Sequence, residues 1–292
     1  MPALPRPHDF LFDHIVVVGV GLIGGSIAKA LKSRGLVRKI TGLGRNADRL
    51  RAAKNSGLID AVATSATELE QFSLAVVCTP VDRIADDVRS LQAVAASSAL
   101  ITDAGSVKAR ICRELSLHQP GTATFIGSHP MAGSEQGGWE HANSELFEGR
   151  ICAITPVTPS EPAVLSIEKF WSAIGMQTIR LNPEQHDRCV ALTSHLPHAT
   201  AAAVAALLTP EAWPLAATGF RDTTRVASGD PSLWTSILIE NRQAVSNHLR
   251  DLIGLLSQFA TSLDSKNTTE IEVLLSKGKT ARDEWLQSRT LN

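Results

Sequence analysis

A glycine-rich turn, GVGLIG at residues 19–24, constrains the fold of this chain more than any other segment. It follows a β-branched run at residues 14–19 and opens a helical pattern. In such a strand–turn–helix unit Gly19 permits the tight turn, Gly21 lets backbone approach a pyrophosphate, and Gly24 lets the helix pack on the strand. The helix N-terminus favours a bound phosphate. The motif predicts a dinucleotide site rather than an empty glycine turn, with cofactor contacts from Gly19, Gly21, Leu22, Ile23 and Gly24.

Strand and helix patterns alternate through the first half of the chain. After the first helix, at residues 22–31, a second helix is expected at residues 48–55. Further short apolar runs predict strands at residues 39–43, 74–78, 100–103, 124–126, 150–155 and 177–181. Such alternation implies parallel strands with right-handed crossovers. We therefore predict an α/β fold whose N-terminal domain, residues 1–182, is a Rossmann-type doubly wound sheet.

The second half, residues 183–292, has a helical character and predicts an all-α domain for substrate binding and dimerisation. Residues 232–264 contain no proline, and their apolar residues recur at helical spacing. A single helix of that length spans on the order of 50 Å, more than the width of a small domain. This length favours packing against a second subunit in a homodimer. The alternative is a kink near Gly254 that keeps the helix within one monomer.

The bulk composition excludes several classes of partner. The formal net charge of -1 leaves no basic surplus for nucleic acid or an anionic membrane. The first 14 residues contain no apolar signal region, and no apolar run is long enough to span a bilayer. The four cysteines lie far apart without a CxxC pair, which argues against a metal site or a disulfide framework. We expect a cytoplasmic protein that acts on a small molecule.

The end of the second predicted strand bears on cofactor choice. An acidic residue for the ribose 2′-hydroxyl of NAD normally lies near this point, but here Gly44 is followed by Arg45. An arginine can pair with a 2′-phosphate. We expect NADP to be used at least as well as NAD; the alternative is that Arg45 is solvated and Asn46 only caps the next helix.

Residues 128–133, SHPMAG, carry the most informative side chain, His129. We expect the strand before it to end at Ile126, with Pro130 stiffening the turn that follows. An open α/β sheet binds its ligands beyond the carboxyl ends of its strands. A histidine there can accept a proton near neutral pH.

Further motifs give the chain a recognisable order. They are GLIGGS at 21–26, CTP at 78–80, DAGSVK at 103–108, HPMAGSE at 129–135, SHLPH at 194–198, and GFRDTTR at 219–225 with DP at 230–231. In this order the chain closely resembles the prephenate/arogenate dehydrogenases of tyrosine biosynthesis. The resemblance implies oxidative decarboxylation of prephenate or arogenate with hydride transfer to NAD(P). By motif position it adds Thr79 and Pro80 to the cofactor contacts.

The same resemblance implies roles at the ring of the substrate. His129 takes the proton of the ring hydroxyl, and Ser106 forms a second hydrogen bond to that hydroxyl. Ser106 can also serve as the N-cap of a helix starting near Val107. Arg225 grips the ring carboxylate with its planar guanidinium. The alternative for Arg225 is a structural pairing with Asp222, which is expected to orient it in either case.

The remaining assignments concern the far end of the substrate. His198 is expected to face the side chain, which favours prephenate over arogenate, and His195 is as well explained by a structural role. Glu135 is placed at the mouth of the site. Lys108 either attracts the anionic substrate or is solvated, and no metal is expected.

Two other readings remain open. One is a β-hydroxyacid-type dehydrogenase, which uses a helical lysine that we do not find here. The other is a nucleotide-sensing module without turnover, which needs the glycine turn but not the combination of Ser106, His129 and Arg225.

Overall fold

The computed structural model describes residues 11–116, 121–134, 136–157 and 160–290. Its first half is a single eight-stranded sheet with strand order β3-β2-β1-β4-β5-β6-β7-β8. The strands are β1 (Phe12–Val18), β2 (Val37–Leu43), β3 (Ala61–Ala63), β4 (Leu74–Val77), β5 (Leu100–Asp103), β6 (Thr124–Pro130), β7 (Ile151–Thr155) and β8 (Gln177–Arg180). All neighbours pair in parallel except β6 and β7. The predicted doubly wound sheet is confirmed, with one antiparallel pair that the alternation did not predict.

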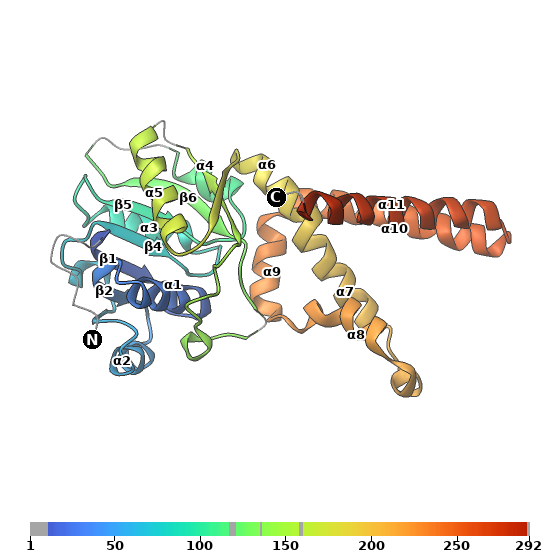
Figure 1. Ribbon diagram of the computed structural model, residues 1–292, viewed down its shortest axis with the longest axis horizontal. Helices are drawn as coiled ribbons and strands as arrows, with labels where there is room; N and C mark the ends of the chain where they lie inside the picture. Colours follow the sequence, from blue (N-terminus) through green and yellow to red (C-terminus); the bar gives the residue numbers. More distant parts are fainter. Residues whose placement is uncertain (1–10, 117–120, 135, 158–159, 291–292) are drawn as a thin grey trace. The chain divides into compact units, whose positions relative to one another are not determined.

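Helices cover both faces of this sheet (Figure 1). The helices of this half are α1 (Leu22–Ser33), α2 (Ala47–Asn55), α3 (Ile84–Gln92), α4 (Ala109–Glu114) and α5 (Glu161–Ala173). Ile15 and Val17 of β1 pack in one core cluster with α1, α2 and α5. Val16 and Val18 pack in the other with α3 and α4. The period-2 alternation of a strand thus divides the core into two layers.

In the described part of the chain, every element after β8 is helical. They are α6 (Pro183–Val190), α7 (Leu196–Ala206), α8 (Thr218–Thr224), α9 (Pro231–Glu240), α10 (Arg242–Asp264) and α11 (Thr268–Thr290). The expected all-α second half is confirmed. The contacts divide the chain into two compact units, the first ending at Arg242 and the second beginning at Gln243 with α10 and α11. None of the described helices combines the length and apolar character needed to cross a membrane.

The predicted single helix over residues 232–264 is wrong. It is broken at Asn241, which leaves α-helical geometry at φ -110° and ψ 24°, whereas Gly254 lies inside the unbroken α10. The side-chain amide of Asn241 donates to the backbone carbonyl of Asp187 at 2.8 Å. Asparagine side chains compete for backbone hydrogen bonds in this way and disfavour helix interiors. The length argument for a dimer therefore fails.

The strand that carries His129 is also longer than expected. β6 continues through Pro130, and His129 pairs opposite Ala153 of β7. Proline is tolerated there because β5 pairs with β6 only as far as Ile126, so no ladder bond to β5 is lost. His129 is thus held in a strand at the carboxyl edge of the sheet, rather than in a turn beyond it.

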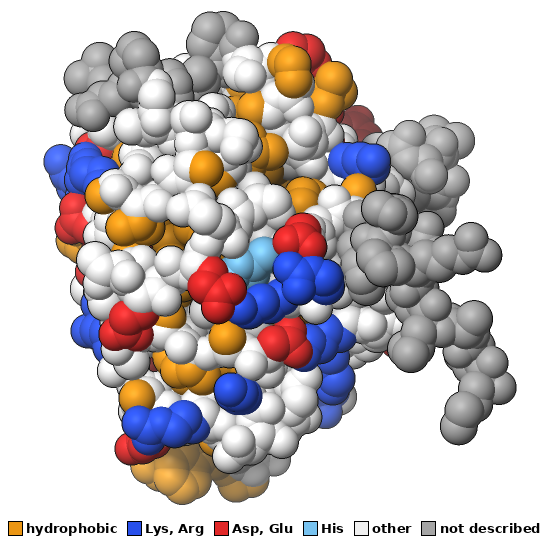
Figure 2. Space-filling model, turned by 90° about the vertical axis from the view of Figure 1, so that its left-hand side faces the viewer, with side chains coloured by type: hydrophobic (Ala, Val, Ile, Leu, Met, Phe, Trp, Pro, Cys, Tyr) orange, Lys and Arg blue, Asp and Glu red, His pale blue; other side chains and the backbone are white. Residues whose placement is uncertain are grey.

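On the face drawn in Figure 2, acidic and basic side chains lie interspersed. This pattern agrees with the near-neutral net charge of the sequence.

Candidate active site

A pocket of about 720 Å³ opens at the carboxyl ends of β1, β2 and β4. This is where the strand order reverses, since β2 lies on one side of β1 and β4 on the other. Open α/β sheets bind nucleotides at such a switch point. Of the predicted cofactor residues, the wall contains Gly19, Gly21, Arg45, Thr79 and Pro80. Leu22, Ile23 and Gly24 begin α1 behind it and are not among its lining residues.

The glycine turn has the geometry of a dinucleotide cradle. Gly19 has φ +85°, and a Cβ there meets the carbonyl oxygen of Cys78 at 2.9 Å. A Cβ on Gly24 meets the carbonyl oxygen of Gly19 at 2.3 Å, so α1 packs directly on the turn. Gly21 has open space where a Cβ would stand, which leaves its backbone accessible to a ligand. The residues present therefore fit a bound pyrophosphate.

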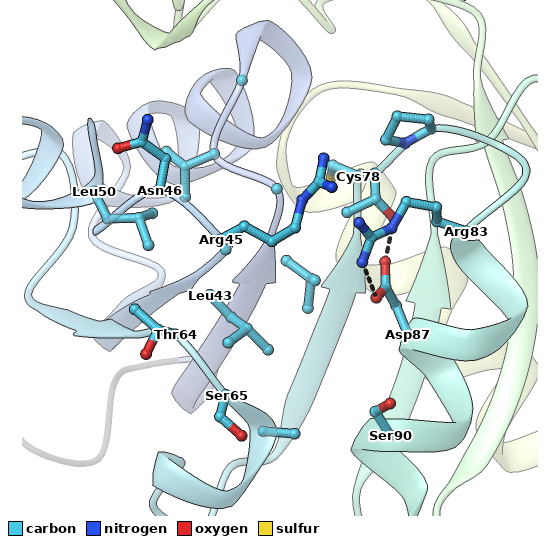
Figure 3. A pocket seen from close by; sticks show the side chains of 18 of the residues that line it. Leu43, Arg45, Asn46, Leu50, Thr64, Ser65, Cys78, Arg83, Asp87 and Ser90 are labelled. Atoms are coloured by element: carbon cyan, nitrogen blue, oxygen red, sulfur yellow. Dashed lines mark hydrogen bonds and ion pairs between the residues drawn. The ribbon is translucent and has the colours of Figure 1, made fainter. Parts of the chain in front are cut away.

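Arginines line the other side of this pocket (Figure 3). Arg45 is exposed at the end of β2, and Arg49 stands one turn into α2. Asn46 caps α2 by accepting the N–H of Arg49 at 3.0 Å. The acid in the wall, Asp87, is engaged by the Thr79 hydroxyl at 2.6 Å and by Arg83 at 3.4 Å. The pocket thus offers cations without a free carboxylate at the end of β2.

A chain of buried side chains lies behind His129. His129 Nδ1 is 2.8 Å from His186 Nε2, and His186 Nδ1 is 2.8 Å from a carboxylate oxygen of Asp187. All three residues are buried. The same carboxylate accepts the backbone N–H groups of Lys108 at 2.7 Å and Ala109 at 2.9 Å. Asp187 of α6 therefore caps α4 and anchors the histidine chain at once.

The direction of this chain fixes the proton on His129. A carboxylate only accepts hydrogen bonds, so a neutral His186 carries its proton on Nδ1 and presents a bare Nε2. That nitrogen must accept from His129 Nδ1, which leaves His129 Nε2 without a proton. His129 is thereby held as a hydrogen-bond acceptor at the atom that does not touch His186.

The electrostatics of the site keep His129 neutral. Burial lowers the pKa of His129 well below its ordinary value of 6.5, and electrostatic interactions with His186 and Lys108 lower it further. A neutral imidazole with a free Nε2 is the form that a general base requires. Since a protonated His129 is disfavoured in the folded protein, this form persists below pH 6.5.

Lys108 is neither solvated nor available to a substrate. Its side chain is fully buried, and Nζ donates to the Asp103 carboxylate. Asp103 also accepts the N–H of Gly105 at 2.9 Å and that of Ser128 at 3.0 Å. Both readings of Lys108 were wrong, because a buried carboxylate ends β5 and requires a partner. This ion pair ties the loop that carries Ser106 to the strand that carries His129.

Ser106 lies half-buried in that loop. It is not an N-cap, because α4 begins at Ala109 and its N-cap residue is Lys108. The N–H groups of Lys108 and Ala109 at the start of α4 are instead bound by the Asp187 carboxylate. Its predicted contact with the substrate hydroxyl stays a prediction.

The helical half contributes a second histidine pair. His195 and His198 are buried on either side of Pro197. His198 stacks on Trp234, with ring centroids 3.5 Å apart. Burial lowers the pKa of His198 below its ordinary value. His198 Nδ1 and His195 Nε2 are buried without a hydrogen-bond partner among the described residues.

A π-helical segment, Ala191–His195, precedes this pair. Pro197 has no N–H, and its ring crowds the carbonyl four residues earlier, at Thr193. The π-helical turn before Pro197 is wider than an α-helical turn and leaves room for the proline ring. Such segments are frequent at functional sites.

Arg225 and Asp222 lie on the exposed side of this half. Arg225 begins a short 3₁₀ segment, Arg225–Ser228, that contacts α7. Asp222 pairs with Arg221 at 3.2 Å, so the expected pairing with Arg225 is not formed. The role of Arg225 at the ring carboxylate stays a prediction. Glu135 lies outside the described residues.

Sequence reasoning missed His186, Asp187 and Asn241. Their only local signal was the adjacent pair His186-Asp187 in the first helix after Asn182, which the structure buries together with Val190. No three His, Cys, Asp or Glu side chains in the described ranges are grouped to hold a metal ion.

Comparisons with known proteins agree with this geometry. A model described as "Prephenate dehydrogenase, nucleotide-binding domain" matches residues 27–180, and one described as "Prephenate dehydrogenase, dimerization domain" matches residues 182–277. Prephenate dehydrogenase of Bacillus subtilis is 31% identical, over 93% of this chain and 75% of its own length. Cyclohexadienyl dehydrogenase of Zymomonas mobilis is 30% identical, over 88% of this chain and 90% of its own length.

Solved structures give the same result. Prephenate dehydrogenase from Aquifex aeolicus, in complex with hydroxyphenyl propionate and NAD+, superimposes with a TM-score of 0.84 at 30% identity, covering 93% of this chain and 98% of that one. Arogenate dehydrogenase from Synechocystis gives 0.78 at 30% identity, covering 93% and 99%. On this evidence the chain belongs to the prephenate dehydrogenase family.

Proposed function

We propose that this protein catalyses the NAD(P)-dependent oxidative decarboxylation of prephenate to 4-hydroxyphenylpyruvate. The observation that carries the proposal is the buried chain Asp187–His186–His129, which leaves His129 Nε2 as an acceptor at the carboxyl edge of the sheet. A nucleotide-sensing module has no use for such a base. A β-hydroxyacid-type dehydrogenase needs a lysine at its substrate, whereas Lys108 is buried against Asp103.

The proton and the electrons of this reaction balance between the substrate, the cofactor and His129. NAD(P) held by the glycine turn would supply the hydride acceptor for the ring carbon that bears the hydroxyl. His129 Nε2 takes the hydroxyl proton. As carbon dioxide leaves the opposite carbon, its bonding electrons make the ring aromatic and place charge on the oxygen, to which His129 returns the proton. The protein therefore supplies mainly position and one reversible proton transfer.

Ser106 and Arg225 complete the proposed contacts at the ring. Ser106 hydrogen-bonds the same hydroxyl as His129, in a loop fixed by Asp103 and Lys108. Arg225 pairs with the ring carboxylate, and replacing it with alanine mainly raises KM, by about tenfold or more. A change confined to kcat contradicts that role.

The choice between prephenate and arogenate rests on His198. Its buried Nδ1 has no partner among the described residues and suits a hydrogen bond to the side chain. With its proton on Nδ1, His198 donates to the keto oxygen of prephenate but not to the ammonium group that arogenate carries there, because an ammonium group cannot accept a hydrogen bond. The test is the rate of nicotinamide reduction by purified protein with each substrate in turn. A higher kcat/KM for arogenate reverses the assignment, and no turnover of either substrate overturns the proposed function.

We also propose that NADP is used at least as well as NAD. The support is Arg45, exposed in the pocket wall with no carboxylate beside it at the end of β2. Arg45→Ala is expected to lower kcat/KM for NADP by about 10- to 100-fold, the usual worth of a charge-assisted hydrogen bond, and to change the value for NAD little. Arg51→Ala is a matched control, because Arg51 pairs with Asp48 on the outer surface of α2. A strong preference of the unmodified enzyme for NAD sinks the idea.

The remaining proposals are a homodimer formed through the helical half, a domain boundary near residue 182, and a cytoplasmic location. Apolar side chains of the α10–α11 unit are exposed, Ile253 by 59% and Leu263 by 62%, which suits burial against a second copy. The free cysteines suit a reducing compartment. Light scattering on the purified protein tests the dimer, and a monomer at assay concentration contradicts it.

A further inference from the structure

The backbone carbonyl of Asp187 has an effect separate from that of its carboxylate. This carbonyl accepts a hydrogen bond from Asn241 Nδ2 at 2.8 Å. Since a carbonyl can only accept, the atom of Asn241 facing it must be the amide nitrogen. The orientation of the Asn241 side chain is therefore fixed.

The same amide nitrogen lies 3.2 Å from His195 Nδ1. With one hydrogen directed to Asp187, the second is available to His195, so His195 Nδ1 is an acceptor. A neutral imidazole that accepts at Nδ1 carries its proton on Nε2. Burial lowers the pKa of His195 to about 4, which keeps this ring neutral at physiological pH.

The proton on His195 Nε2 has no acceptor among the described residues. The atom is buried and unpartnered, and leaving such a donor unpaired is costly. His14, a structural histidine, differs: its Nδ1 is 2.8 Å from the carbonyl of Gln71, and its Nε2 is 2.8 Å from the Thr41 hydroxyl. A buried histidine that serves packing alone satisfies both nitrogens, and His195 does not.

His195 also belongs to the same cluster as the base. Its charge state is coupled to Asp187, His186 and His198, and it contributes to the lowered pKa of His129. The edge of its ring faces Trp234, the side chain on which His198 stacks. The free donor therefore lies among the groups of the candidate active site.

We propose that His195 donates a hydrogen bond from Nε2 to an acceptor oxygen of the bound substrate, and that Asn241 is the positioning residue that holds His195 in this tautomer. Asp187 then sets opposite proton positions on two histidines. Through its carboxylate it makes His129 Nε2 an acceptor, and through its carbonyl it makes His195 Nε2 a donor. This inference rests on the proposed function for the identity of the substrate.

The first test reads the tautomers directly and needs no turnover. Long-range ¹H–¹⁵N correlation spectra of histidine-labelled protein distinguish Nδ1–H from Nε2–H rings, with His→Gln variants for assignment. His195 is expected to be Nε2–H and His129 Nδ1–H, with His14 as an internal Nδ1–H reference because its Nδ1 faces a carbonyl. A His195 ring that is Nδ1–H, or a cation at neutral pH, overturns the proposal.

The second test adds the proposed product, 4-hydroxyphenylpyruvate, to the same sample. The His195 Nε2–H resonance is expected to shift on binding, whereas the His14 resonances stay in place. Binding that shifts other active-site resonances but leaves His195 unchanged contradicts the substrate contact. If the product does not bind at all, the proposed function fails, and the tautomer result still stands by itself.

The third test asks whether Asn241 acts through His195. Asn241→Asp replaces the amide donor that faces His195 Nδ1 with a carboxylate acceptor. His195 then carries its proton on Nδ1 and loses the donor at Nε2. We expect kcat/KM to fall about tenfold, the worth of one hydrogen bond, and the spectrum of His195 to change to Nδ1–H. In a His195→Phe background the same change is expected to cost little further, because coupled residues are not additive.

Equal losses from Asn241→Asp in both backgrounds overturn the positioning role. Asn247→Asp is the matched control, since it introduces the same charge at an exposed position of α10. His195→Gln keeps an amide donor at the far end of the side chain and is expected to retain most of the activity that His195→Phe loses.

Discussion

The cofactor pocket and the histidine cluster are built by opposite means. The pocket is open, about 720 Å³ in volume, and shaped by backbone turns at Gly19 and Gly21 with exposed side chains such as Arg45. The cluster is buried, and its members, on β6, α6, the π-helical segment Ala191–His195 and the α9–α10 break, are joined by side-chain hydrogen bonds. A local motif suffices to specify the first. The second exists only when distant segments meet, so each of its parts depends on the others.

The largest effect on stability is expected from breaking the buried ion pair between Lys108 and Asp103. Lys108→Met leaves the Asp103 carboxylate buried without its partner, which typically costs about 3–5 kcal/mol of the free energy of unfolding. Lys279→Met removes an exposed pair with Asp283 on α11 and is expected to cost about 1 kcal/mol or less. Urea denaturation of both variants measures the difference. Similar losses in the two variants contradict the view that the cluster depends on buried charge.

The second largest effect is expected from replacing the proposed general base, His129. His129→Ala removes the acceptor for the hydroxyl proton, and a positioned general base is usually worth about 100-fold or more in rate. Because cofactor binding depends on the other region, the affinity for NAD(P) is expected to stay near that of the unmodified protein. Initial rates and cofactor titration measure the two quantities. Near-normal turnover refutes the role of His129.

The contrast between the regions also explains what the sequence could predict. The turn at residues 19–24 requires glycine for local reasons, so the first strand, the first helix and the pocket followed from it. The break at Asn241 depends on the carbonyl of Asp187, 54 residues earlier in the chain, and no helical periodicity could indicate it. Lys108 was expected either to attract the substrate or to be solvated, because nothing in the sequence pairs it with Asp103. The last four residues of β6 pair only with β7, which runs antiparallel against the expected pattern.

The cofactor region has its own decisive substitution. Gly19→Ala combines an unfavourable φ of +85° with a contact at 2.9 Å to the backbone of Cys78. Gly57 has φ +81° but open space around its Cβ position, so Gly57→Ala isolates the cost of the backbone conformation, about 1 kcal/mol. Gly19→Ala is expected to cost more stability than Gly57→Ala, and it alone is expected to weaken NAD(P) binding, by about tenfold or more. Thermal unfolding and cofactor titration of the pair check this. Equal behaviour of the two variants contradicts a glycine requirement set by the pocket.

The smallest expected effect is a shift of the pH profile. His129 must be neutral to accept the hydroxyl proton, and burial lowers its pKa below 6.5, with a second contribution from His186. As pH falls, kcat/KM is therefore expected to hold through 6.5 and to decline only at lower pH, where His129 becomes protonated. His186→Gln keeps an acceptor for His129 Nδ1 but removes the electrostatic interaction of the His186 ring that lowers the pKa of His129, so the acid limb is expected to move upward, toward 6.5. The profile is measured with the Asn247→Asp protein as a reference. An acid limb of the unmodified enzyme at or above 6.5 contradicts a buried neutral base, and a limb that His186→Gln leaves in place shows that burial alone sets the pKa of His129.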